Sequence, residues 1–404
     1  MSLEAQQTNY YKLLADDKEL DMILSKYIFS AIFIPVVILS GCSLNSHIEK
    51  NSNTLPSGNE EKGQENLVSN IYLENSSLID ETGKQNTQLS QEELEQAAYS
   101  GDINSQTILG FLYAEGRGVK QDYQKAKMWF EKAASRGSAP AQDYLGFIYA
   151  NGLGVKQDYL IACEWYEKAA TQGNLHAQTN LGRCYLNGQG VKQDYLKAKD
   201  WFEKAAIRGD SDAQALLGSL YSEGLGVRQD YQKAREWLEK AAIQGNIEAQ
   251  LMVGIHFGEG WGGKQDYREA RKWFEKAAAR GHAGAQSLLG MYYEFGLGVR
   301  EDYQKAREWY EKSAVQGDSG GQCGLGRLYF NGHGVRQDYP KARELFEKAS
   351  SQGHARAQWY LGSFYENGFG VRQDYLQAKE WYGKSCDNGL QLGCDGYKRL
   401  NNRK

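Results

Sequence analysis

The chain lacks a basic surplus, a group of closely spaced metal ligands and one motif of the serine enzymes, Ser-x-x-Lys. Its 47 Lys and Arg are outnumbered by 51 Asp and Glu, giving a net charge of −4, whereas nucleic-acid-binding proteins normally carry a marked basic excess. The six histidines are widely separated and no Cys or carboxylate cluster accompanies them, so the sequence predicts no metal site or other cofactor. No Ser-x-x-Lys motif of the penicillin-recognising enzymes is present.

A long apolar run is also missing. The most apolar stretch covers residues 28–41 and directly follows Lys26. A comfortable membrane helix needs roughly 20 residues, so this run is too short for one and fits the apolar region of an export signal. Met1–Asp21 is polar and partly acidic, which suits a signal poorly. We therefore expect translation to start at Met22, with residues 1–21 a non-native or mis-annotated extension. An inner-membrane anchor at 28–41 is the alternative.

What is present is a strict repeat of 36 residues. The dipeptide Leu-Gly, replaced once by Val253-Gly254, recurs in one register from Leu109-Gly110 to Leu361-Gly362, and Asp-Tyr keeps the same interval. A fixed period of this length indicates a solenoid, because one unit cannot bury its own apolar face and needs its neighbours.

Residues 137–172 illustrate the predicted unit. In the first half, Leu145, Gly146 and Tyr149 fall on one helical face. Gly152 and Gly154 interrupt that helix, and Asp158 is a suitable N-cap for a second one. The second helix would bury small residues and one aromatic anchor and end at a left-handed glycine. Its predicted buried face comprises Ala162, Trp165, Ala169 and Ala170, and its terminal glycine is Gly173.

This pattern resembles the Sel1-like repeats, relatives of the tetratricopeptide repeats. The resemblance implies an all-α fold: a right-handed α/α superhelical solenoid of eight helix pairs with terminal capping helices. The solenoid would span 90–388 and a C-terminal capping helix 389–404. The Gly-x-Gly pairs lie between two predicted helices, so they are turn elements and not a phosphate-binding loop.

The segment before the repeats resembles a bacterial lipoprotein precursor. Leu39-Ser40-Gly41-Cys42 is similar to a lipobox, which implies a signal peptide at 22–41, cleavage before Cys42 and acylation of that residue. Ser43 in place of Asp implies the outer membrane, with the periplasmic or outer side left open. Residues 42–89 are acidic and polar with little to bury, and we expect a disordered tether there.

Cysteine usage fits an exported protein. Cys386 and Cys394 are separated by seven residues that include Gly389. This spacing resembles the helix-to-helix disulfide of the cysteine-rich Sel1-like proteins, and such a bond fits an oxidising compartment. The other three, Cys163, Cys184 and Cys323, occupy different phases of the repeat. For these we expect buried free thiols.

The resemblance also implies a binding surface on the first helices. In tetratricopeptide-like stacks these helices line the concave face, and positions that vary between units are free to contact a ligand. Large side chains at such positions are typical of protein interfaces. The candidates are Phe111, Phe147, Arg183, Leu251, Ile255, Met291, Phe295, Arg327, Phe330 and Trp359, with Ser219, Glu294, Ser363 and Glu366 in the same columns.

The sequence therefore predicts a non-enzymatic, membrane-anchored scaffold that binds a partner protein or peptide. Two alternatives stay open. Some cysteine-rich relatives carry a β-lactamase label, and an aromatic column could stack on cell-wall glycan such as peptidoglycan. Nucleic acid is not expected as a ligand.

Overall fold

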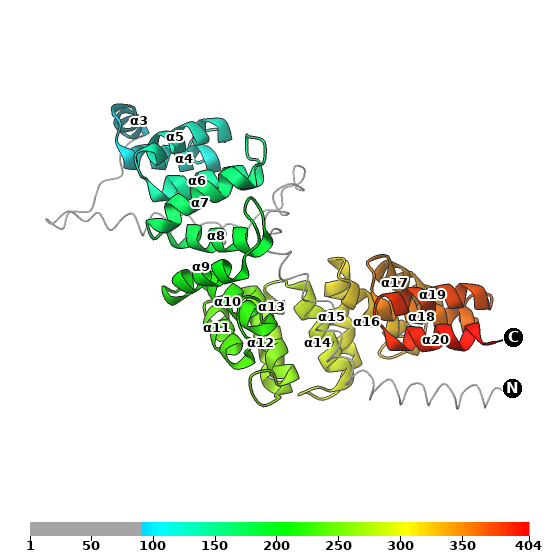
Figure 1. Cartoon of the computed structure of the whole chain (residues 1–404). Coiled ribbons are helices and arrows are strands. Elements are labelled where there is room, and N and C mark those ends of the chain that lie inside the picture. Colours follow the sequence, from blue (N-terminus) through cyan, green and yellow to red (C-terminus); the bar gives the residue numbers. More distant parts are fainter. Residues whose placement is uncertain (1–90, 404) are drawn as a thin grey trace. The chain divides into compact units, whose positions relative to one another are not determined.

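The computed structural model describes residues 91–403, which form two compact units, 91–201 and 202–403. We call these the N-terminal and C-terminal units. All regular structure in the described part of the chain is helical, in eighteen helices labelled α3 to α20 (Figure 1). The all-α fold of tandem 36-residue helix pairs is thus confirmed. The predicted extension, signal peptide and Cys42 lie outside the described residues, as does the tether.

Each repeat contains two helices of 13 residues. The first helices are α4 (Ile103–Glu115), α6 (Ala139–Asn151), α8 (Leu175–Asn187), α10 (Ser211–Glu223), α12 (Ile247–Glu259), α14 (Ala283–Phe295), α16 (Ser319–Asn331) and α18 (Ala355–Asn367). The second helices are α5 (Tyr123–Ser135), α7 (Tyr159–Thr171), α9 (Tyr195–Ile207), α11 (Tyr231–Ile243), α13 (Tyr267–Ala279), α15 (Tyr303–Val315), α17 (Tyr339–Ser351) and α19 (Tyr375–Asp387). Helices α3 (Gln91–Ser100) and α20 (Gln391–Asn401) flank them.

Local sequence fixes both ends of each helix. In the repeat of α6 and α7, Gly152 ends the first helix with φ 68° and its N–H donates to the carbonyl of Ile148. Asp158 then caps the second helix by accepting from the N–H groups of Leu160 and Ile161. These contacts satisfy backbone groups that a helix end otherwise leaves unpaired, so the predicted caps are confirmed.

The aromatic anchor of the second helix is not the tryptophan. Trp165 is only partly buried, and the Lys168 ammonium lies 4.0 Å from its ring centroid. The next residue, Tyr166, is 4% exposed and fills the core. It meets Gly146, where a Cβ would approach the ring carbons of Tyr166 to 2.6 Å. The glycine of the Leu-Gly dipeptide therefore makes room for this ring.

Trp129 is an exception among the tryptophans, because it is 2% exposed. Helix α3 covers it: Leu94 and Ala98 belong to the same cluster, and the Tyr99 ring packs edge-on against it at 5.1 Å. Helix α3 therefore caps the N-terminal unit, as predicted. Helix α20 packs on α19 at the other end of the chain, where Leu400 joins the cluster around Tyr382.

Candidate binding surface

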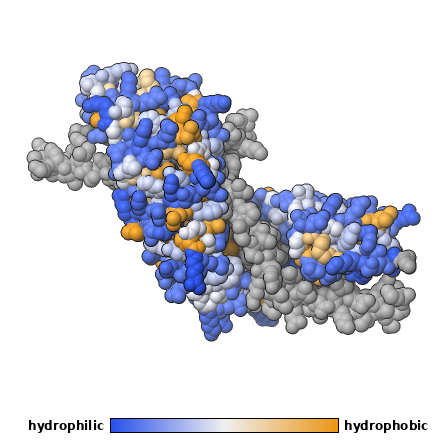
Figure 2. All heavy atoms as spheres, viewed as in Figure 1, coloured by the Kyte–Doolittle hydropathy of each residue, from blue (hydrophilic) through white to orange (hydrophobic). Residues whose placement is uncertain are grey.

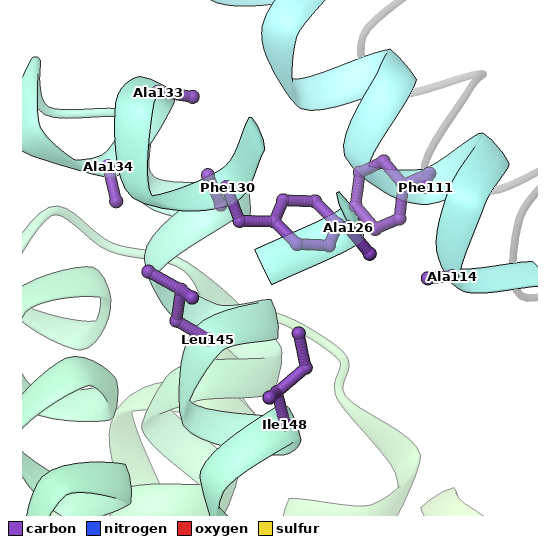
Figure 3. Close-up of a cluster of buried hydrophobic side chains, with 9 residues drawn as sticks. Phe111, Ala114, Ala126, Phe130, Ala133, Ala134, Leu145 and Ile148 are labelled. Atoms are coloured by element: carbon purple, nitrogen blue, oxygen red, sulfur yellow. The ribbon is translucent and has the colours of Figure 1, made fainter. Parts of the chain in front are cut away.

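Phe111 does not lie on a free surface. Its side chain is 6% exposed and its ring lies edge-on to those of Phe130 and Tyr144, at 5.1 Å in each case. Figure 3 shows it directed into the cluster that Leu145 and Ile148 complete from the next repeat. The prediction that Phe111 contacts a partner is wrong, because burying an aromatic ring in this cluster is its more favourable use.

Three further candidates are wrong for the same reason. Leu251 and Ile255 on α12 are 1% and 3% exposed. Phe330 on α16 is 5% exposed, and its ring lies 5.3 Å from that of Phe364 on the next first helix. Side chains in these columns vary in size because they fill spaces of different size between repeats.

Arg327 is also internal, where it balances a buried carboxylate. Its Nε and Nη2 donate to the two carboxylate oxygens of Glu294 at 2.8 and 2.6 Å, and the Tyr310 hydroxyl donates to Glu294 Oε2 at 2.7 Å. Burial, together with the Glu294 carboxylate, raises the pKa of Tyr310 well above its ordinary value. Removing one partner from such a group leaves an uncompensated charge. Arg327 therefore serves the fold and is not available to a ligand.

A pairing of tyrosine and arginine recurs where the second helix carries a tyrosine anchor. Tyr382 donates to Glu366, which also accepts from Arg399 of α20, and Arg183 acts electrostatically on Tyr166. In all three cases the arginine follows the tyrosine by 17 residues. Repeats with Phe or Leu as anchor have no arginine at that distance. This correlation is visible in the sequence and identifies the arginines as partners of buried tyrosines.

Five of the ten candidates stay partly exposed on first helices: Phe147, Arg183, Met291, Phe295 and Trp359. Phe147 and Arg183 belong to the N-terminal unit and the other three to the C-terminal unit. The Phe295 ring lies 4.8 Å below the Arg327 guanidinium, so the buried ion pair holds it in place. The molecular face in Figure 2 is mainly hydrophilic with separate apolar patches. A protein ligand would therefore meet a few anchors in each unit.

The described residues contain no group of three or more His, Cys, Asp or Glu able to hold a metal ion. They do contain a serine–histidine contact, in which Ser222 Oγ and His256 Nε2 are 3.0 Å apart. His256 is fully buried, and burial lowers its pKa to about 3. Its Nδ1 has no hydrogen-bond partner among the described residues, so the orienting carboxylate of a catalytic triad is missing.

One segment matches the Gly-x-Ser-x-Gly pattern of serine hydrolases, Gly317-Asp318-Ser319-Gly320-Gly321. That motif needs a strand-to-helix turn that exposes the serine. Here Asp318 is the N-cap of α16, and Ser319 is the first residue of that helix. The segment joins two helices, so the structural context of a nucleophile elbow is absent from it.

Two disulfides each join a second helix to the helix that follows it, α7 to α8 and α19 to α20. Cys386 bonds Cys394 with their Cα atoms 4.5 Å apart, the pair that the resemblance implied. Cys163 bonds Cys184, with their Cα atoms 6.4 Å apart. The expectation that both are free thiols is therefore wrong. They lie at different phases of the repeat, but α7 packs on α8 and brings them within bonding distance. Cys323 is buried and forms no disulfide within the described residues, as expected.

No helix in the described part of the chain has the length and apolar character needed to cross a membrane.

Comparison with known proteins identifies the class to which this architecture belongs. The Sel1 repeat matches eight consecutive segments: 103–138, 139–174, 175–210, 211–246, 247–282, 283–318, 319–354 and 355–390. The chain belongs to the Sel1 repeat family, and its fold is that of a tetratricopeptide-like repeat scaffold, a class typical of protein–protein interaction.

Two solved structures are similar over most of the chain. One is a protective antigen of uropathogenic Escherichia coli strains that displays an SLR fold, with 38% identity and a TM-score of 0.66 over 78% of this chain and 68% of the antigen. The other is a Sel1 repeat protein from Oxalobacter formigenes, with 34% identity and a TM-score of 0.56 over 76% of this chain and 90% of that protein. No curated protein matches the chain.

Proposed function

We propose that the chain is an exported, lipid-anchored scaffold of a bacterial envelope, which binds a partner protein or peptide through the first helices of its repeats. The observation that carries this proposal is the partial exposure of Phe147, Phe295 and Trp359. Large aromatic side chains remain at the surface of first helices although the surrounding packing positions are filled. Aromatic anchors of this kind dominate protein interfaces.

Rigidity supports the same function. The helix pairs are closed by capped ends and by close packing of a first-helix glycine on the second helix. Two disulfides join a second helix to the helix that follows it. A surface that is already ordered loses little conformational freedom on binding, so a small number of anchors is sufficient.

The export part of the proposal has separate support. Disulfides form and persist in oxidising compartments. Two occur in the described residues, one between two repeats and one between the last repeat and α20. The apolar run at 28–41 and the Cys42 motif point in the same direction. The related Escherichia coli chain is described as a protective antigen, which fits an exported protein.

The test uses a photo-crosslinking amino acid placed at Phe295 or Trp359 of the full chain in the cells that express it. We expect one defined adduct from both positions. The matched control is Val315, which is 88% exposed at the end of second helix α15 and should give no such adduct.

For the double variant Phe295→Ala/Trp359→Ala, the crosslinking amino acid is placed at Met291. This variant should lose the adduct, while its thermal unfolding stays close to that of the parent. Phe330→Ala should instead lower the unfolding temperature, because it empties a core position. Equal capture from Val315, or collapse of the Phe295→Ala/Trp359→Ala fold, would place the binding surface elsewhere.

A further inference from the structure

Two hollows of the C-terminal unit lie at the same place in two different repeats. One has a volume of about 650 Å³ and is lined by the loop before α17 and the first residues of that helix. The other, of about 590 Å³, is lined by the corresponding residues before α13. Tyr329 and Arg336 of the first hollow correspond to Phe257 and Lys264 of the second, 72 residues earlier. The same hollow therefore recurs in two repeats of this unit.

Both hollows are basic. Arg307, Arg336 and Lys341 line the first, and Arg235, Lys264 and Arg268 line the second. Each contains a single acidic residue, Asp338 or Asp266. These aspartates are N-caps: Asp338 accepts from the N–H of Lys341 at 3.0 Å, and Asp266 from those of Arg268 and Glu269 at 2.9 and 3.1 Å. Their charge is partly balanced by the helix N-terminus, which leaves the cations in excess.

The cations differ in whether they already contact other groups of the protein. Arg235 donates to the carbonyl of His256, and Arg307 lies 3.6 Å from Glu311. Arg336 and Lys264 are exposed and form no ion pair within residues 91–403. These two loop cations are therefore available to an external anion.

Aromatic rings form the apolar walls of both hollows. Tyr329 and Tyr339 line the first, and Phe257 and Tyr267 line the second. The Lys341 ammonium lies 4.2 Å from the Tyr329 ring centroid and donates to its hydroxyl at 2.6 Å. Rings beside cations suit a ligand that presents a ring face together with a negative group.

A basic residue recurs at the same position of the loop between the two helices of every repeat, and we call it the loop cation. The position before the Gln-Asp-Tyr or Glu-Asp-Tyr sequence is always basic and always exposed, at Lys120, Lys156, Lys192, Arg228, Lys264, Arg300, Arg336 and Arg372. Within the N-terminal unit, and separately within the C-terminal unit, equivalent loops of stacked repeats follow one another along one edge. Since each 36-residue repeat contributes one such cation, consecutive repeats within a compact unit present these cations in a row.

We propose that this row of loop hollows binds an anionic polysaccharide, a chain of sugar rings that carries carboxylate or phosphate groups at regular intervals. Similar sites that recur once per repeat fit a ligand whose charged unit is itself repeated, which the sequence of an ordinary peptide is not. Several weak sites on one strand then act together through their high effective concentration. The hollows are lined by loop and second-helix residues together with Tyr329 and Phe257 of first helices. Their lining does not include Phe147, Phe295 or Trp359 of the surface proposed above for a protein partner.

One repeat departs from the pattern in an informative way. In the loop before α15, Glu301 replaces the Gln that follows the loop cation in the other repeats. It places a second carboxylate next to Asp302 and beside Arg300. Glu301→Gln should therefore increase the affinity for an anionic strand.

The experiment measures binding of polygalacturonate fragments of defined length to the full chain in a neutral detergent, by titration calorimetry. We expect affinity to rise with fragment length and to fall with added salt, and neutral dextran not to bind. The variant Lys264→Gln/Arg268→Gln/Arg336→Gln/Lys341→Gln should lose at least about tenfold in affinity, because two cooperating sites lose their cations.

The matched control removes four cations from the other ends of second helices, in Lys240→Gln/Lys276→Gln/Lys312→Gln/Lys348→Gln. It should stay within about twofold of the parent, since exposed charges far from the strand are screened. The proposal fails if the loop variant also stays within twofold, or if the control loses as much. It fails equally if polyglutamate, single-stranded DNA or vesicles with anionic lipid bind as tightly as polygalacturonate. Loss of the Phe295 crosslink in the loop variant would show instead that the two surfaces are one.

Discussion

At the scale of single residues, Glu223 is a carboxylate in an unfavourable position, because burial disfavours its charged form. It lies partly buried at the end of α10, and burial raises its pKa from 4.5 to about 7. Four other repeats place asparagine there, at Asn151, Asn187, Asn331 and Asn367. The amide of Asn151 donates to the carbonyl of Phe147 at 2.9 Å. An amide satisfies this position without a charge, whereas a carboxylate must be protonated or lose hydration.

Glu223→Asn should therefore stabilise the protein in a pH-dependent way. Because its pKa is raised by folding, the folded state holds the Glu223 proton more tightly than the unfolded state does. The resulting stability is fully present below about pH 4.5 and is lost as the pH rises through about 7. The variant should exceed the parent clearly at pH 8, and this advantage should shrink toward pH 5. Urea denaturation at the two pH values measures the difference.

Glu236→Asn, at an exposed position of α11, serves as the control and should change stability by the same amount at both pH values. An advantage of Glu223→Asn that is independent of pH would show that the amide helps through hydrogen bonding alone. Desolvation would then not be the cause.

At the scale of the element, a glycine of the first helix packs directly on a ring of the second helix. A Cβ on Gly290 of α14 would come to 2.5 Å of the ring of Tyr310 on α15. Gly290→Ala should destabilise the C-terminal unit by about 1–3 kcal/mol, because the buried ring cannot move away. Thermal unfolding followed by circular dichroism measures the loss.

Gly284 in the same helix provides the comparison. A Cβ there meets only the imidazole of His282, at 3.2 Å. Gly284→Ala should be neutral or stabilising by up to about 1 kcal/mol, since alanine is the better helix former. Similar losses for both variants would mean that the effect comes from the backbone and not from the ring contact.

The elements themselves could be predicted from the sequence, because period, caps and turn glycines are local signals. The identity of the anchor could not. Trp165 and Tyr166 are adjacent and both aromatic, and only the direction of α7 relative to Gly146 decides which ring is buried. The Cys163–Cys184 bond likewise depends on how α7 packs on α8, which no spacing rule states.

The candidate surface was predicted least well, for a physical reason. Variation between repeats predicts freedom from packing, yet Phe111 and Phe330 are 6% and 5% exposed. The same variation predicts an interface role for Arg327, which instead pairs with Glu294 inside the protein. Burial is a property of the stack as a whole, and a single repeat does not contain that information.

At the scale of the whole molecule, the proposed lipid anchor determines where both surfaces act. Several acyl chains on Cys42 would give stable attachment to a membrane, since each buried CH₂ contributes about 0.8 kcal/mol. We expect the full chain in its host to incorporate radiolabelled palmitate and to sediment with membranes. Cys42→Ser should abolish the label and release the chain from the pellet. Cys323→Ser, at a buried cysteine that forms no disulfide in the described part of the chain, should change neither. If Cys42→Ser still sediments with membranes, the segment at 28–41 holds the chain there as an uncleaved anchor. The lipoprotein proposal would then be wrong, while the scaffold proposal would remain open to its own test.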